Sequence, residues 1–269
     1  MQPDGPVVLV VAHADDEVIG AGAWLANLPE EARRQVKIAY TTDSAPANLW
    51  FARQAGFETR EAYAAARVEE RNKALRVAGI SPEQCVEFGF RDQESWRSLQ
   101  EITALLRPLL NRVQPAIILT HPYEGGHPDH DAAAFAVRQA VEQIAANAPR
   151  IVEFTSYHRG PTSPGAPEGL ETGRFLPVEG SVEESVALTE EERRRKQEMF
   201  ACYKTQARVL AWFTVNEERF RSAPRYDFTR PPHDGPLHYE TLDWGITGEV
   251  WRQYAAAALQ AGRRSHACR

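Results

Sequence analysis

The stretch Val7-Val-Leu-Val-Val-Ala-His13-Ala-Asp15-Asp16-Glu17-Val-Ile-Gly-Ala-Gly decides the fold. Its apolar, β-branched first half predicts a buried strand, and helical spacing of apolar residues resumes at Val18. A histidine and three acids therefore occupy a tight strand-to-helix turn, at the carboxyl end of a strand, where parallel α/β sheets bind ligands. Because crowded acids repel one another unless a positive charge lies among them, we expect a divalent metal there.

A second fragment has the same order of strand, polar loop and helix. The apolar run 115–120 predicts a buried strand, and the loop after it reads His121-Pro-Tyr-Glu-Gly-Gly-His127-Pro-Asp129-His130-Asp131. Apolar positions between 133 and 144 then follow helical spacing. If both strands lie parallel in one sheet, the two loops emerge at the same edge and can share one ion.

The rest of the chain continues the alternation of strands and helices. This pattern predicts a Rossmann-like, doubly wound α/β fold, with a mostly parallel sheet and helices on both faces. We expect a single domain over 1–269, with a core at about 7–210 and an irregular extension at 211–269 that packs on it. Further strands are predicted at 35–41, 84–90, 150–157 and 174–178, helices at 18–28, 59–78, 98–113 and 189–210, and capping boxes at Ser98 and Thr189. The segments 44–57 and 159–173 are predicted loops near the site.

Composition limits the compartment and the partners. The 269 residues are 43% hydrophobic and 25% charged, which suits a packed core. The formal net charge is −6, and no block of Lys and Arg is interleaved with aromatic residues, which argues against nucleic acid. No run approaches the ~20 apolar residues of a membrane-spanning helix. Cys85, Cys202 and Cys268 lack CxxC spacing and favour a reducing compartment, so we expect a cytoplasmic protein.

The two loops resemble a known pair of motifs. Ala12-His13-Ala14-Asp15-Asp16-Glu17 and His127-Pro128-Asp129-His130 are similar to the signatures of the LmbE-like, or PIG-L, family of zinc-dependent N-deacetylases. That family usually has proline where this chain has Ala14, a change that alters the stiffness of the turn but removes no ligand or base. Arg67-x-x-Glu70, Asp92-Gln93-Glu94 and the segment from Lys196 to Gln206 extend the resemblance over about 7–206.

The resemblance implies roles for the residues of both loops. His13, Asp16 and His130 would be the metal ligands, and two imidazoles, one carboxylate and an open fourth position form the usual catalytic zinc arrangement. Zinc lowers the pKa of its water to about 7, and Asp15 would be the general base. His127 would stabilise the oxyanion and donate a proton to the leaving amine. Asp129 would hold an imidazole in its tautomer. Fe(II) or another divalent ion stays open as the metal.

Four other residues have two interpretations each. By resemblance Arg67 binds sugar hydroxyls, but it also fits a surface residue paired with Glu69 or Glu70. Asp92 would bind substrate or cap the next helix. We expect Glu17 to orient its loop or cap the following helix. His121, at the end of its strand, is balanced between a supporting and a functional role.

We therefore predict a zinc-dependent hydrolase that removes an acyl group, most simply acetyl, from an N-acetylated amino sugar such as an N-acetylglucosamine conjugate. The substrate is a small molecule, and the resemblance leaves a homo-oligomer open. One alternative is an amidase of a thiol-sugar conjugate that uses the same site. Two histidines and one acid also form the facial triad of non-haem Fe(II) oxygenases, although these need no free base beside the triad. A nucleotide-binding module is disfavoured because no GxGxxG follows the first strand.

Overall fold

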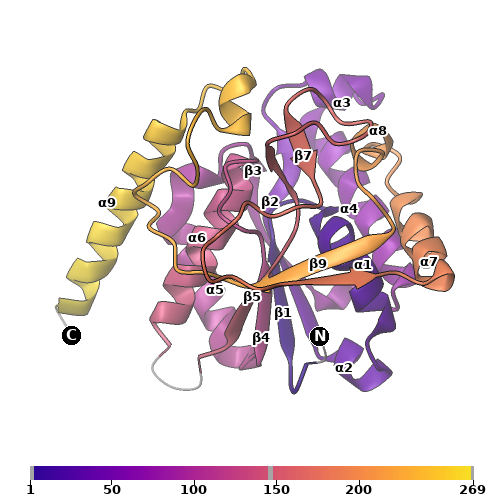
Figure 1. The fold of residues 1–269 in the computed structure, drawn as a ribbon, viewed down its shortest axis with the longest axis horizontal. Coiled ribbons are helices and arrows are strands. Elements are labelled where there is room, and N and C mark those ends of the chain that lie inside the picture. The colour runs from indigo at the N-terminus through magenta and orange to yellow at the C-terminus, as the bar shows by residue number, and fades with distance from the viewer. Residues whose placement is uncertain (1–2, 145–147, 268–269) are drawn as a thin grey trace.

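A seven-stranded sheet forms the centre of the molecule in this computed structural model, which describes residues 3–144 and 148–267 (Figure 1). The strand order is β3-β2-β1-β4-β5-β9-β8. The first five strands run parallel, whereas β9 is antiparallel to both of its neighbours. Their bounds are β1 Val7–Val11, β2 Val36–Pro46, β3 Cys85–Asp92, β4 Ile117–Thr120, β5 Arg150–Phe154, β8 Glu183–Ala187 and β9 Glu217–Ser222. A separate hairpin pairs β6 (Tyr157–Arg159) with β7 (Leu170–Thr172).

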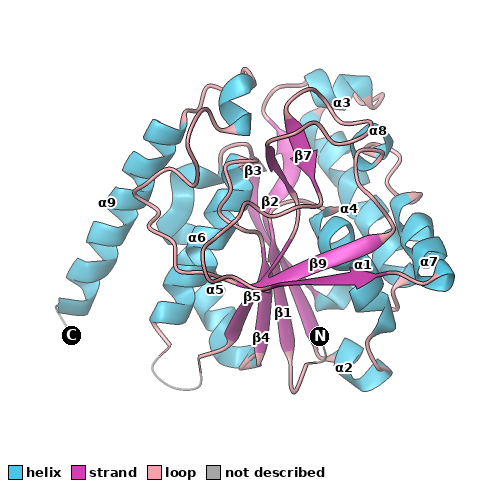
Figure 2. Ribbon diagram, viewed as in Figure 1, coloured by secondary structure: helices cyan, strands magenta, loops and turns pink. Residues whose placement is uncertain are grey.

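Helices cover both faces of the sheet, as Figure 2 shows. One layer is α1 (Asp16–Asn27), α4 (Arg60–Val77) and α7 (Glu190–Phe200), and the other is α5 (Leu99–Val113) and α6 (Pro128–Glu142). Because side chains alternate across a strand, Leu9 packs with Leu25 and Leu75 on the first face, and Val10 packs with Leu106 and Val137 on the second. The short helices are α2 Glu30–Arg34, α3 Trp50–Gln54 and α8 Ala207–Leu210, with 3₁₀ turns at Pro82–Gln84, Ser95–Ser98 and His238–Thr241.

The strand order reverses between β1 and β4. The chain runs outward from β1 through β2 to β3, then returns to place β4 on the other side of β1. Loops that leave β1 and β4 diverge toward opposite faces, and the crevice between them is where doubly wound sheets bind ligands. The predicted fold class is therefore confirmed, and both histidine loops lie at this point of reversal.

Several predicted elements differ from the structure. The strand predicted at 150–157 ends at Phe154, before β6, and the predicted loop 44–57 contains the end of β2 and α3. No strand forms at 174–178, because the backbone of Leu176 is bonded to side chains, with its N–H donating to Glu124 and its carbonyl accepting from Arg221. The helix predicted to run to about Leu210 keeps its Thr189 capping box but ends at Phe200. Ser98 makes no side-chain cap, because it belongs to the 3₁₀ turn that precedes α5.

The extension at 211–269 is more regular than predicted. It contributes β9 to the sheet and the long helix α9 (Gly248–Ala267), which lies outside α5 and α6 (Figure 1). Trp251 of α9 is fully buried in a cluster with Trp96 and Phe135, and its indole N–H donates to the Pro128 carbonyl at 3.0 Å. The segment 223–237, which contains four prolines, is irregular as expected, whereas β9 and α9 on either side of it were not predicted.

Candidate active site

The two histidine loops meet directly. The register pairs Val10 of β1 with Thr120 of β4, so the residues that follow these strands emerge side by side. The backbone N–H of Ala12 donates to His121 Nε2 at 3.2 Å. The Ala14 N–H donates to Ser44 Oγ at 2.8 Å, a bond that proline at this position could not make.

His13, Asp16 and His130 converge at the bottom of the crevice. Asp16 Oδ1 lies 3.2 Å from His130 Nε2, and Asp16 Oδ2 lies 3.4 Å from His13 Nδ1. The two imidazoles approach to 3.3 Å between His130 Nε2 and His13 Nδ1. All three side chains are buried. The structure therefore brings together the three predicted ligands, which lie 114 residues apart in sequence between Asp16 and His130.

His121 belongs to the same cluster. Its ring stacks on that of His130 with centroids 3.9 Å apart and an angle of 5° between the planes. Its Nε2 lies 3.1 Å from Asp16 Oδ2, so Asp16 contacts His130 with Oδ1 and both His121 and His13 with Oδ2. Burial and the nearby His130 lower the pKa of His121 to about 4. His121 therefore lies against Asp16 and His130, where it could support the ligands or bind a metal itself.

A second set of acids faces the other nitrogen of His13. His13 Nε2 lies 3.1 Å from Asp92 Oδ1 and 3.4 Å from Asp129 Oδ2. Asp129 also accepts from the backbone of Gln93 at 2.6 Å and of Ser95 at 3.0 Å, and from Ser95 Oγ at 2.7 Å. These bonds hold the Asp129 carboxylate in place, which is what the orientation of an imidazole requires. Asp92 does not cap the next helix.

His127 occupies the N-cap of α6. Its Nδ1 accepts from the Asp129 N–H at 3.1 Å, which leaves Nε2 to carry the proton of the neutral ring. Nε2 lies 3.7 Å from Asp92 Oδ1. Burial, with His13 and His130 close by, holds the pKa of His127 well below its usual range.

Asp15 has different surroundings from its neighbour Asp16. Its Oδ2 lies 3.2 Å from Arg67 Nη2, and its backbone N–H donates to Glu17 Oε2 at 3.2 Å. The backbone of Asp15 has a φ of 154°, a value that residues other than glycine rarely adopt. Burial raises the pKa of Asp15 to about 7, against the effect of Arg67, which lowers it.

The donor set fits a divalent metal ion. Three groups of side chains present ligand atoms within 4.8 Å of one another: His13 with His127 and His130; His13 with Asp92, His127 and Asp129; and Asp16 with His121 and His130. Buried imidazole and carboxylate are the ligands of catalytic zinc, and also suit other first-row divalent ions. Asp92 Oδ1 is buried and accepts no hydrogen bond, although His13 Nε2 lies 3.1 Å away, so it remains available as an acceptor for a cation.

Arg67 is a buried residue. Its side chain reaches from α4 to Asp15 and donates to the Ala14 carbonyl at 2.9 Å. The alternative of a surface pair with Glu70 was wrong, because Glu70 accepts from the N–H and the hydroxyl of Thr205 at 2.9 and 2.6 Å. Its predicted contact with a sugar remains a prediction.

Two residues of the segment 196–206 support the site in ways that the sequence did not predict. Tyr203 donates to Glu17 Oε1 at 2.8 Å, and Gln206 Nε2 donates to Tyr63 Oη at 2.7 Å. Glu17 is fully buried and joins Tyr203 to the Asp15 backbone, so it orients the loop, which was one of its two expected roles. The pattern Tyr-x-x-Gln after a helix was a usable signal for this contact.

A cavity of about 270 Å³ opens above these groups. Seven of the eight predicted site residues line it, and Asp129 lies behind them. The others that line it are Tyr63, Gln93, Tyr157, Gln206 and His238 among the polar side chains, and Ile19, Pro46, Phe51, Pro167, Val209, Trp212, Phe213, Leu242 and Trp244 among the apolar ones. The segments 44–57 and 159–173 thus both reach the cavity, as expected.

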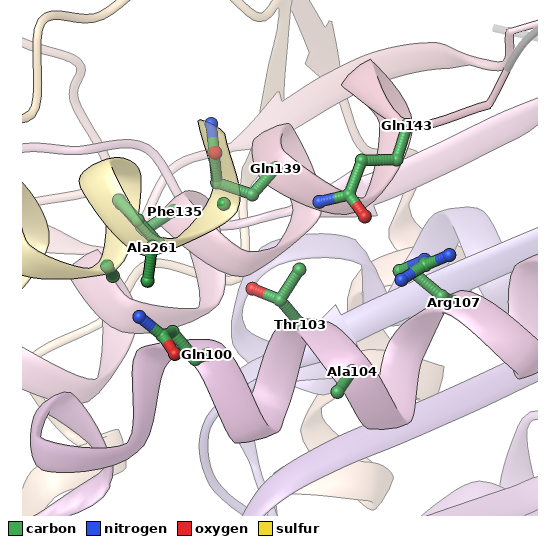
Figure 3. Close-up of a pocket in the computed structure, with 10 residues that line it drawn as sticks. Gln100, Thr103, Ala104, Arg107, Phe135, Gln139, Gln143 and Ala261 are labelled. Carbon is green, nitrogen blue, oxygen red and sulfur yellow. The ribbon is translucent and has the colours of Figure 1, made fainter. Parts of the chain in front are cut away.

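A second cavity, of about 170 Å³, lies between α5, α6 and α9 (Figure 3). Figure 3 shows Gln100, Thr103 and Arg107 from α5 facing Gln139 of α6 and Gln143, which directly follows α6. No acid, histidine or cysteine is among the described residues that line it. These residues therefore offer no general base and no typical metal ligand, unlike those of the crevice at the sheet edge.

Comparison with known proteins agrees with this geometry. Residues 8–141, which include both histidine loops, match the model of the family described as PIG-L, GlcNAc-PI de-N-acetylase. The chain belongs to the PIG-L family. The resemblance of the two loops is confirmed, and the PIG-L match includes every predicted site residue.

Two curated relatives are similar to the chain in sequence. A probable N-acetyl-alpha-D-glucosaminyl L-malate deacetylase 2 from Bacillus anthracis is 27% identical over 150 residues, which are 55% of this chain and 64% of the relative. A 1D-myo-inositol 2-acetamido-2-deoxy-alpha-D-glucopyranoside deacetylase from Salinispora arenicola (strain CNS-205) is 26% identical over 203 residues, 67% of this chain and 66% of the relative. The chain spans just under two thirds of the length of each.

Solved structures share the fold at low identity. A deacetylase triple mutant involved in teicoplanin biosynthesis superposes with a TM-score of 0.62 at 18% identity, over 82% of this chain and 99% of that chain. The N,N'-diacetylchitobiose deacetylase from Pyrococcus horikoshii gives 0.55 at 18% identity, over 82% and 85%. Among the residues of this protein that the structure describes, none of the helices is long and apolar enough to cross a membrane.

Proposed function

We propose that this protein is a metal-dependent N-deacetylase that hydrolyses the acetamide of an N-acetylglucosamine conjugate, with zinc as its metal. One observation carries the proposal: adjacent carboxylates have different partners, Asp16 among imidazoles and Asp15 beside Arg67. One acid is then free to bind the ion and the other to move protons. Both curated relatives are named as deacetylases of N-acetylated glucosamine conjugates, which supports the substrate class.

His13, Asp16 and His130 would hold the ion, with His121 supporting Asp16 from behind. A bound divalent ion would polarise the amide carbonyl and acidify a water molecule. Asp15 accepts a proton from that water, and the pKa that burial gives it, about 7, suits exchange near neutral pH. In the net reaction water cleaves the C–N bond, so that acetate and a free amine are formed.

His127 and Arg67 complete the proposed machinery. With its Nδ1 accepting from Asp129 N–H, His127 presents Nε2–H to the cavity, where it can donate to the carbonyl oxygen as charge develops there. Its low pKa and the Asp129 N–H on Nδ1 keep the ring neutral near pH 7, which does not favour the expected transfer of a proton from His127 to the leaving amine. The proton that Asp15 takes from water would supply that amine instead. Arg67 lines the cavity beside Asp15, where it would bind sugar hydroxyls. Asp92, 3.1 Å from His13 Nε2, also lines the cavity and would contact the substrate.

The domain organisation and the compartment are also part of this proposal. We propose one domain over 1–269, because β9 completes the central sheet and Trp251 of α9 is buried against α6. The thiols of Cys85 and Cys202 are free, which supports a reducing compartment such as the cytoplasm, whereas Cys268 lies outside the described residues.

Acetate release tests the function. The zinc-loaded protein is incubated with N-acetylglucosamine and its glycosides, and acetate and free amine are measured together with bound zinc by elemental analysis. We expect both products in equal amounts, their loss on chelation, and their return on addition of zinc. His13→Ala and His130→Ala should each lower bound zinc, because each removes one of three ligands. Full zinc occupancy in both variants would contradict the proposed ligand set.

A further inference from the structure

The outer wall of the active-site cavity is apolar. Phe51 of α3, Val209 of α8, and Trp212, Phe213, Leu242 and Trp244 all face it. Phe51, Trp212 and Trp244 are each partly exposed, so part of their aromatic surface is left in contact with water. Such surface, concentrated in a concave site, marks a place where an apolar group binds.

This wall begins next to the chemical groups. The Trp244 ring lies 4.8 Å from that of His127. Phe213 lies 6.2 Å from Tyr157, whose ring is in turn 5.3 Å from that of His130. A substituent carried by a sugar whose acetamide reaches His127 and His130 would therefore lie against these aromatic rings.

Among the described residues that line the cavity, none offers an unpaired cationic side chain to an anionic substituent. Among the described residues that line it, Arg67 is the only arginine, and lysine is absent. Arg67 already pairs with Asp15 at 3.2 Å. His238 also lines the cavity, but burial and the nearby Arg159 lower its pKa to about 4, so that it is neutral at pH 7. An anion placed against this wall would lose its hydration without gaining a partner.

We infer that the substrate of this enzyme is an N-acetylglucosamine conjugate whose substituent is neutral and apolar, an aryl or alkyl group held by the wall around Phe51, Trp212 and Trp244. This inference rests on the proposed deacetylase function and names the substrate class within it. The amino sugar itself would meet the polar side chains at the base of the cavity, among them Arg67 and Gln206.

Three matched glycosides test the inference. The zinc-loaded protein is assayed for acetate release from the methyl, phenyl and 4-carboxyphenyl glycosides of N-acetylglucosamine, in both anomers. We expect kcat/KM for the phenyl glycoside to exceed that for the methyl glycoside by about tenfold or more, as burial of several apolar carbons requires. The 4-carboxyphenyl glycoside has the same ring plus a charge, and should lose most of this advantage. Equal values for phenyl and methyl, or a preference for the carboxylate, would overturn the inference.

Two variants test whether the apolar wall of the cavity causes the preference for the phenyl glycoside. Trp212→Ala should reduce the ratio of phenyl to methyl kcat/KM by about tenfold, because it removes aromatic contact area. Leu105→Ala is the control, since Leu105 is an apolar side chain 44% exposed on α5 and away from the cavity. It should leave the ratio unchanged, and an unchanged ratio in Trp212→Ala would contradict the proposed wall.

Measuring how the three glycosides bind tests this inference independently of the proposed deacetylase activity. If no glycoside releases acetate, the proposed function fails, and quenching of tryptophan fluorescence by the same three glycosides then decides the inference. Tighter binding of phenyl than of methyl and 4-carboxyphenyl would support the apolar wall. Equal binding of all three would overturn it.

Discussion

At the scale of single residues, the surroundings of Asp15 and Asp16 give these two adjacent carboxylates different pKa values. Both are buried carboxylates, and composition cannot distinguish them. Asp16 contacts His13, His121 and His130, whose positive charge would hold its pKa well below the usual range despite burial. Asp15 has one cation, Arg67, and burial dominates, so its pKa rises. The first carboxylate is suited to hold an ion and the second to exchange a proton.

The two acids should therefore respond differently to the same substitution. Asp16→Asn should weaken zinc binding, because a neutral amide is a poorer partner for a dication. Asp15→Asn should keep the metal and lose turnover by roughly 10²–10⁴, the usual effect of removing a general base. Zinc content and kcat of both variants are the measurement. Loss of zinc from Asp15→Asn would reverse the roles, and full activity would show that no base is needed.

Arg67 should control the pH at which Asp15 works. The guanidinium lowers the pKa of Asp15, so Arg67→Ala should raise that pKa. Since the base must be ionised, the acidic limb of kcat/KM should move to higher pH, by roughly one to three units. Arg34→Ala is the control, because this side chain is 74% exposed and pairs only with Glu30 among the contacts described. Superimposable pH profiles for Arg67→Ala and the wild type would exclude this role.

At the scale of elements, α1 is bent just after the catalytic turn. Ala21 has non-helical angles, with φ −146°. In a regular helix the Ala23 N–H would bond to the Ile19 carbonyl. Here Ala23 N–H donates to Glu218 at 2.7 Å, and Ile19 O accepts from Lys196 at 2.9 Å. Lys196 and Glu218 also pair at 2.8 Å, so a buried ion pair from α7 and β9 is inserted into the broken helical bond.

Removing Glu218 should strongly destabilise the fold. Glu218→Ala leaves Lys196 buried without its carboxylate, and two backbone N–H groups, those of Ala23 and Trp24, lose their acceptor. The expected loss in free energy of unfolding is about 3–5 kcal/mol, measured by urea denaturation. Glu191→Ala breaks the exposed pair with Arg195 and should cost at most about 1 kcal/mol. Equal losses in both variants would contradict this account of the bend.

Across the whole molecule, Arg221 of β9 joins the extension to the catalytic loops. It lies 3.0 Å from Glu124 of the β4–α6 loop and 2.7 Å from Glu153 of β5. All three side chains are buried, and one guanidinium cannot neutralise two carboxylates. Burial consequently raises the pKa of Glu124 to about 8 and that of Glu153 to about 7.

These raised pKa values predict how stability depends on pH. A carboxyl group with a higher pKa in the folded state binds its proton more tightly there, so its contribution to stability is present below the unfolded pKa of 4.5 and is lost as pH rises through about 8. The free energy of unfolding should thus fall over this window. Glu124→Gln cannot ionise, and its stability relative to wild type should improve with rising pH in urea denaturation. Parallel curves for the two proteins would contradict this prediction.

Local sequence was enough to locate the parallel core and the two loops. The runs 7–11 and 117–119 are continuous and apolar because parallel strands are buried on both faces, and each strand ends at a histidine loop. Thr59 and Thr189 cap their helices as their sequences predict, because a side chain that bonds a backbone N–H three residues on acts locally.

Only the tertiary structure decided which partners these residues meet. Arg67 was equally suited to solvent, and it is the packing of α4 that places it on Asp15. β8 and β9 are short, charged strands at one side of the sheet, whose pattern resembles a loop until β5 supplies a partner. The aromatic wall comes from segments as far apart as Phe51 and Trp244. Sequence therefore determined the chemical groups and the edge of the sheet, because these depend on neighbours along the chain, whereas long-range packing determined the contacts that distinguish one carboxylate from the next.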